Sequence, residues 1–82
     1  MECDFIVEKD NRITQLIQVT SSLKEEKTKK RELRVFSKTI EDLQLNNVQL
    51  LVILEDNTSN IIYDDLNIKT INVKEWLIEL GI

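Results

Sequence analysis

The sequence predicts an α/β domain in which a mixed β-sheet is covered by one long crossover helix, with a short helix at the C-terminal end. Three observations lead to this prediction. Residues 4–9 and 12–20 read as two short strands joined by a tight polar turn, residues 23–45 carry an apolar stripe at helical spacing, and residues 48–54 are almost continuously apolar. A strand, a long helix and a buried strand in that order form a crossover unit, whose two strands are expected to lie side by side and parallel.

The first two strands are predicted from an alternating pattern. Phe5 and Val7 point to one side of the chain and Ile6 to the other, which is the period-2 signature of a strand. The Asp10-Asn11 pair can adopt the positive φ angles that a two-residue hairpin turn requires. The second strand is more apolar than the first, so we expect it to be the more central of the two.

The long helix is predicted over residues 23–45. Ser22 followed by Glu25 matches a capping box at its start, and the Asn46-Asn47 pair can end it in a left-handed conformation. Glu25 precedes Lys29 by four residues, and Glu26 precedes Lys30 by four, which is the spacing of stabilising ion pairs. The face expected to pack on the sheet consists of Leu33, Phe36, Ile40 and Leu43.

Residues 48–54 have the composition of a strand that is buried on both faces, as in a parallel sheet. A second hairpin is expected over residues 61–63 and 68–71, with residues 64–67 as its turn. In the final helix, Asn72 and Glu75 match another capping box. The expected buried face of that helix consists of Val73, Trp76, Leu77 and Leu80.

Composition excludes several kinds of chemistry. The chain has no His and a single Gly, at position 81, so it cannot form a serine–histidine relay, a His-based zinc site or a glycine-rich phosphate loop. Cys3 is the only cysteine and cannot form an internal disulfide, and its position predicts a small core residue. No apolar run approaches the roughly 20 residues that span a bilayer. We therefore expect residues 1–82 to form one cytoplasmic domain without membrane contact.

The charge balance is unfavourable for binding nucleic acid. The formal net charge is −4 and the pI is about 4.8, whereas phosphate neutralisation requires Lys and Arg. Residues 24–34 are a local exception, because they contain six basic residues. The interspersed Glu25, Glu26 and Glu32 are expected to cancel most of that field, which predicts an ordinary solvated helix face.

The two N-terminal strands carry a pattern that resembles a metal-dependent nuclease site. Glu2-Cys3-Asp4-Phe5-Ile6-Val7 precedes Leu16-Ile17-Gln18-Val19-Thr20, and the PD-(D/E)XK restriction-endonuclease superfamily places an Asp on one strand and an acid-x-Lys triplet on the next. The whole chain resembles the C-terminal domain of unknown function that follows the AAA-type ATPase module in many bacterial and archaeal P-loop proteins. This resemblance implies a degenerate restriction-endonuclease-like fold fragment at the C-terminal end of a longer ATPase.

The resemblance also implies candidate site residues. Asp4 takes the place of the strand aspartate, Gln18 that of the second acidic ligand and Thr20 that of the lysine, while Glu2 is a further candidate ligand. Gln18 brings no negative charge to a metal and Thr20 no positive charge to a transition state, so the nuclease activity is expected to be lost. Each residue also has an ordinary explanation: Asp4 as a strand-end acid, Gln18 as the partner of a neighbouring polar group, and Thr20 as a helix-capping residue.

The function expected from these observations is a non-catalytic accessory domain that docks on the ATPase module of the same chain or recognises another partner. No cofactor is expected in this segment, and ATP and Mg²⁺ would belong to the ATPase module. A homo-oligomer is compatible with an uncovered sheet edge. The alternatives are a divalent-metal-dependent nuclease that uses Glu2, Asp4 and Gln18, and a nucleic-acid-binding module that uses the 24–34 helix face without cleavage.

Overall fold

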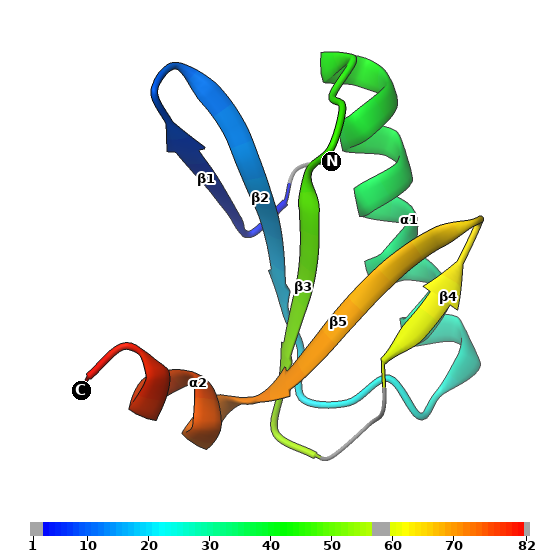
Figure 1. Cartoon of the computed structure of the whole chain (residues 1–82). Helices are drawn as coiled ribbons and strands as arrows, with labels where there is room; N and C mark the ends of the chain where they lie inside the picture. Colours follow the sequence, from blue (N-terminus) through cyan, green and yellow to red (C-terminus); the bar gives the residue numbers. More distant parts are fainter. Residues whose placement is uncertain (1–2, 57–59, 82) are drawn as a thin grey trace.

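The fold is a five-stranded mixed sheet with a long helix on one face and a short helix on the other (Figure 1). This computed structural model describes residues 3–56 and 60–81. The strand order across the sheet is β1-β2-β3-β5-β4. The elements are β1 (Phe5–Lys9), β2 (Arg12–Val19), α1 (Glu26–Leu43), β3 (Gln49–Leu54), β4 (Ile61–Tyr63), β5 (Leu66–Asn72) and α2 (Val73–Glu79).

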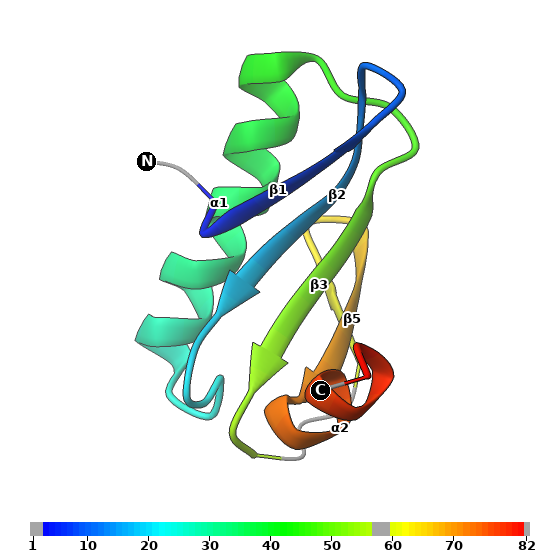
Figure 2. The same cartoon turned by 90° about the vertical axis from the view of Figure 1, so that its left-hand side faces the viewer.

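The predicted crossover unit is confirmed. β2 and β3 are parallel neighbours, with Gln15 opposite Gln49 and Val19 opposite Ile53. α1 connects them and lies along one face of the sheet (Figure 2). β5 adds a third parallel strand beside β3, and the antiparallel strands β1 and β4 form the two edges.

Both hairpin turns consist of two residues with left-handed backbone. Asp10 and Asn11 have φ angles of 54° and 66°, as predicted from their sequence. Asp64 and Asp65 have φ angles of 52° and 62°. The second turn is therefore shorter than the predicted residues 64–67, because Leu66 and Asn67 already pair with β4.

α1 begins later and ends earlier than predicted. The N–H of Thr20 donates to the carbonyl of Ile53 (3.1 Å), and that of Glu55 donates to Ser21 (3.2 Å), so pairing with β3 continues past β2 and delays the helix. Its N-cap is Glu25, without a side-chain cap, and the predicted Ser22 capping box is wrong. The helix is terminated by Gln44, whose φ is 53°, and not by the Asn46-Asn47 pair.

The main core lies between α1 and the sheet. Leu33 and Phe36 of α1 are completely buried there, and Ile40 packs against the same cluster, as predicted. Leu43 was expected to complete this face, but its side chain is 49% exposed. Leu45 and Val48 from the following loop contact the core instead, so the last turn of α1 is left outside it.

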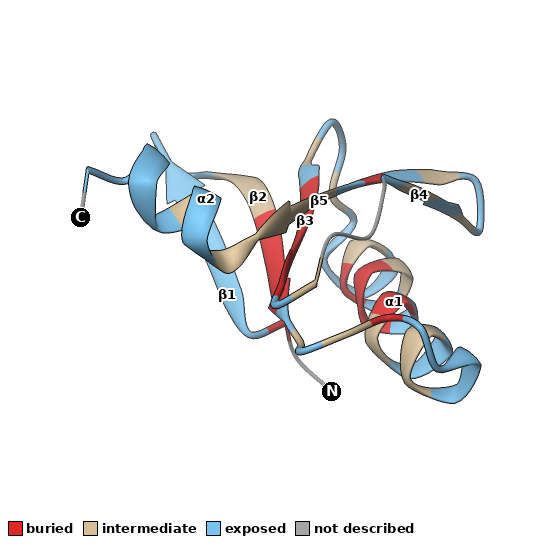
Figure 3. Cartoon of the chain, turned by 90° about the horizontal axis from the view of Figure 1, so that it is seen from below, coloured by how far each residue is buried: buried red, intermediate tan, exposed pale blue. Residues whose placement is uncertain are grey.

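A smaller cluster lies on the opposite face of the sheet. Ile17, Leu51 and Ile53 are buried there, and Val73 and Trp76 of α2 pack against them. The other two predicted contacts of α2 are wrong, because Leu77 and Leu80 are 36% and 54% exposed. α2 has only 7 residues and covers one end of this face of the sheet. Most of α2 is itself exposed to solvent (Figure 3).

In the parts of the chain that the structure describes, neither helix is long and apolar enough to cross a membrane.

Candidate functional site

Gln18 lies at the centre of the predicted nuclease-like site. It sits near the end of β2 on the face that α1 covers, and its side chain is only 2% exposed. Its Oε1 accepts a hydrogen bond from the backbone N–H of Asp4 (2.8 Å). Its Nε2 donates to Oε2 of Glu32 (3.0 Å) and to the Glu32 carbonyl (3.4 Å). Gln18 therefore joins the start of β1, the end of β2 and the inner flank of α1.

Asp4 lies beside Gln18, as the resemblance implies, and its carboxylate also has a partner within the fold. Oδ2 of Asp4 accepts a hydrogen bond from the backbone N–H of Val19 (2.8 Å). Together with the Asp4 N–H bond to Gln18, this bond continues the β1–β2 pairing beyond the first residue of β1. The carboxylate thus closes the open end of a hairpin.

Thr20 is close in sequence to this pair but bonds elsewhere. Its hydroxyl donates to the carbonyl of Ser22 (3.4 Å), within the loop that leads to α1. Thr20 does not cap the helix, because α1 begins only at Glu26. Glu2, the remaining predicted ligand, lies outside the described residues.

Glu32 is the member of this cluster that the sequence analysis missed. It stands four residues before Phe36, and residues four apart on a helix share a face. The half-buried Glu32 is therefore directed to the flank of the sheet rather than to open solvent. The four-residue spacing between Glu32 and Phe36 could have predicted that Glu32 lies on the side of the helix that faces the sheet.

The donor set does not fit a divalent metal ion. Magnesium and calcium sites in proteins use several oxygen ligands, mostly carboxylates. Here the Gln18 oxygen accepts from an N–H group, and Asp4 and Glu32 each use one carboxylate oxygen in the same way. Within residues 3–56 and 60–81, no three His, Cys, Asp or Glu side chains come together as a metal site would require. What Asp4, Gln18 and Glu32 form is a hydrogen-bonded bridge.

Cys3 precedes this bridge and belongs to the core, as predicted. Its side chain is 8% exposed, and its Sγ lies 3.5 Å from Oγ1 of Thr39 on α1. Burial raises the pKa of the Cys3 thiol, the Thr39 hydrogen bond lowers it, and the Asp4 charge raises it, with a net upward shift. A buried thiol with a raised pKa is a weak nucleophile, so Cys3 is a structural residue.

The second surface feature is the sheet face opposite α1. Directly paired residues on neighbouring strands point to the same face, and Phe5 pairs with Ile17 while Val7 pairs with Gln15. Phe5, Val7 and Val19 are 56%, 38% and 43% exposed on this face. We call this surface the open face; it comprises Phe5, Val7, Gln15, Val19, Gln49 and Lys69.

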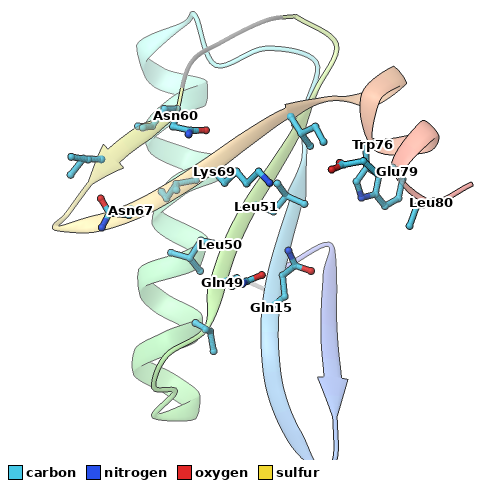
Figure 4. Close-up of a pocket in the computed structure, with 15 residues that line it drawn as sticks. Gln15, Gln49, Leu50, Leu51, Asn60, Asn67, Lys69, Trp76, Glu79 and Leu80 are labelled. Atoms are coloured by element: carbon cyan, nitrogen blue, oxygen red, sulfur yellow. The ribbon is translucent and has the colours of Figure 1, made fainter.

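A groove of about 830 Å³ borders the open face, reaches α2, and is also lined by Leu50 and Ile68 of the main core. Figure 4 shows Gln15, Gln49 and Lys69 on the sheet side of this groove and Trp76 and Glu79 on the α2 side. Most of its wall is apolar or carries neutral amides, and among the described residues that line it only Lys69 and Glu79 are charged. Such a surface suits contact with another protein surface better than contact with a highly charged ligand.

No protein-family model, curated protein or solved structure matches this chain.

Proposed function

We propose that the chain is a non-catalytic, restriction-endonuclease-like accessory domain that acts by docking on a partner protein. The single observation that carries this proposal is the Gln18 bridge. At the positions where the resemblance predicts metal ligands, Asp4 and Gln18 bond to each other and to Glu32 and Val19. These side chains support the fold, and Thr20 stands where the nuclease triplet has the lysine that neutralises charge in a phosphodiester transition state.

The partner we propose is the P-loop ATPase module of the same chain, predicted from the resemblance. The open face supports a docking role, because exposed Phe5 and Val7 lie on one side of an edge hairpin beside an apolar groove. Exposed apolar surface of this kind is typical of interaction sites. A reading frame upstream of Met1 that encodes a Walker-type glycine-rich loop is the expected result, and a frame that stops directly upstream would exclude this partner.

The nuclease alternative is tested by direct assay. Single- and double-stranded DNA and RNA, incubated with the domain and Mg²⁺ or Mn²⁺, should give no products above background, because hydrolysis requires carboxylates to hold the ion and a cation to neutralise charge. Asp4→Asn is the matched variant. Cleavage by the natural sequence that is lost in Asp4→Asn would overturn the proposal in favour of a nuclease.

A reverse test asks whether the scaffold still directs these positions to one site. Gln18→Glu combined with Thr20→Lys restores the acid-x-Lys triplet beside Asp4 and Glu32. We expect the double variant to bind Mn²⁺ in calorimetric titration, while Thr20→Lys alone, which adds no carboxylate, should not. Equal titration curves for both variants would contradict the nuclease-like geometry without affecting the docking role.

A further inference from the structure

The solvent-facing side of α1 carries five basic side chains in one row, which we call the basic stripe. Their spacing of i, i+3, i+4, i+7 and i+11 places them within about 100° of the helix circumference. All five are exposed, and they lie opposite the side on which Leu33 and Phe36 are buried. The basic stripe consists of Lys27, Lys30, Arg31, Arg34 and Lys38.

The glutamates of this segment do not interrupt the stripe, in contrast to the expectation from the sequence. Glu32 is turned inward, where its Oε2 accepts from Gln18. Glu25 is the N-cap and precedes the helix. Glu26 lies about a quarter of a turn from the axis of the stripe. Glu25 and Glu32 are thus separated from the stripe, while Glu26 flanks it one turn before Lys30.

Most of the stripe has no ion-pair partner. Among the described residues, the only ion pair within 4.0 Å joins Lys38 to Asp42 (3.7 Å), and the Glu–Lys pairs predicted for the first turns do not form. Glu41 and Asp42 continue the stripe at its C-terminal end, so the unpaired positive charge is concentrated between Lys27 and Arg34.

The net charge of the chain conceals this asymmetry. The stripe holds five of the eleven basic residues, so the rest of the chain has six basic residues against fifteen acidic ones. A cationic row on an otherwise acidic protein attracts a polyanion at one place and repels it elsewhere. The charge distribution therefore selects one surface and one orientation of binding.

We infer that the basic stripe binds the phosphate backbone of double-stranded DNA. A helix with its side chains is about 10–12 Å across, and the B-form major groove is about 12 Å wide. Lys30 and Arg31 diverge by about 100° around α1, so they can reach phosphates on opposite sides of that groove. The stripe has no aromatic side chain for stacking single-stranded bases, and the major groove of A-form RNA is too narrow for a helix.

The binding is expected to be independent of base sequence. Lysine and arginine side chains on phosphates fix position and orientation but do not read bases. With about four phosphates neutralised, the association constant should fall about 100-fold between 50 and 200 mM salt. This inference concerns a different surface from the Gln18 bridge and the open face, and it does not depend on the proposed function.

Fluorescence anisotropy with a labelled duplex of about 20 base pairs tests the inference. The stripe variant carries Lys27→Gln, Lys30→Gln, Arg31→Gln and Arg34→Gln. The matched control removes the same charge elsewhere, with Lys9→Gln, Arg12→Gln, Lys69→Gln and Lys74→Gln. At 50 mM salt we expect the natural chain to bind in the micromolar range, the control to stay within about 5-fold of it, and the stripe variant to bind at least about 100-fold more weakly.

Further variants and nucleic acids test the same inference. Arg34→Gln alone, which keeps the rest of the stripe, should reduce the slope of log affinity against log salt by about one. Duplex RNA and single-stranded DNA of the same sequence should bind more weakly than duplex DNA. Equal losses in the stripe and control variants, equal binding of duplex RNA, or no binding by the natural chain would overturn the inference. Circular dichroism confirms that each variant is folded.

Discussion

Gln18 makes three hydrogen bonds from a position that is 2% exposed, one with Asp4 before β1 and two with Glu32 of α1. A neutral amide suits this position because it accepts from the Asp4 N–H and donates to Glu32 at the same time. A carboxylate could accept the first bond but would meet the Glu32 carboxylate as a like charge. Gln18, which replaces the second acidic ligand of the nuclease pattern, thus provides hydrogen-bond partners for both Asp4 and Glu32.

Gln18→Ala tests this role directly. We expect the free energy of unfolding to fall by about 2–3 kcal/mol, because the Asp4 N–H loses its acceptor and a buried cavity is created. Gln49→Ala is the matched control, since Gln49 is exposed on β3, and it should change stability by no more than about 0.5 kcal/mol. Urea unfolding followed by Trp76 fluorescence measures both; similar losses would show that the bridge contributes nothing specific.

At the scale of elements, α1 is where local sequence and tertiary structure compete. Its apolar spacing predicted the buried Leu33 and Phe36, because helical periodicity is a property of the segment itself. Its start was set by backbone hydrogen bonds that join the loop after β2 to the end of β3. No capping signal within the helical segment predicts these bonds. Its end followed from Leu45 and Val48 reaching the core. Element type was predictable, whereas boundaries depended on contacts distant in sequence.

The strand pairings and side-chain contacts show the same difference between local and long-range information. The parallel pairing of β2 and β3 followed from connectivity, because a long helix between two strands requires a crossover. The position of β5 beside β3 did not, since its sequence fits an edge hairpin equally well. The proximity of Asp4 to Gln18 was expected from the resemblance, but Glu32 came from another element and was missed. Side-chain partners across elements require the packed structure.

Two substitutions in α1 separate the core face from the exposed end. Phe36→Ala removes a completely buried ring and should destabilise the domain by about 3–5 kcal/mol. Leu43→Ala removes a side chain that is 49% exposed and should cost less than about 1 kcal/mol. Thermal unfolding by circular dichroism provides the comparison. If Leu43→Ala were as damaging as Phe36→Ala, the last turn of α1 would belong to the core as the sequence pattern predicted.

At the scale of the whole molecule, the two proposed surfaces lie on opposite sides. α1 lies on one side of the sheet (Figure 1) and carries the basic stripe on its exposed side, whereas the open face is on the other side of the sheet. One domain can therefore contact a partner protein through the sheet and a polyanion through the helix without competition between them. The sheet between the two surfaces is a fixed spacer, because its parallel strands β2, β3 and β5 hold both faces together.

The open face also has a consequence for the isolated domain, which we expect to self-associate. Phe5 and Val7 lie on β1, an edge strand whose residues are all exposed, and unpaired edges with apolar side chains pair with other chains. The groove beside them holds one lysine and one glutamate, so two copies in a two-fold arrangement could place Lys69 of one copy near Glu79 of the other. An acidic chain would otherwise repel its own copies, but this face carries little of that charge.

Sedimentation equilibrium over a range of protein concentrations measures this association. Phe5→Ser combined with Val7→Ser should weaken it at least about 10-fold, because the few side chains that dominate an interface lie near its centre and each cost more than about 1 kcal/mol when truncated. Ile78→Ser is the matched control: Ile78 is 73% exposed on α2 and does not line the groove, so its substitution should leave the association unchanged. A monomer at all concentrations, or an equal effect of Ile78→Ser, would contradict self-association through the open face. Since all side chains of β1 are exposed, the double variant should remain folded. A change in the apparent molecular mass then measures the loss of association through the open face.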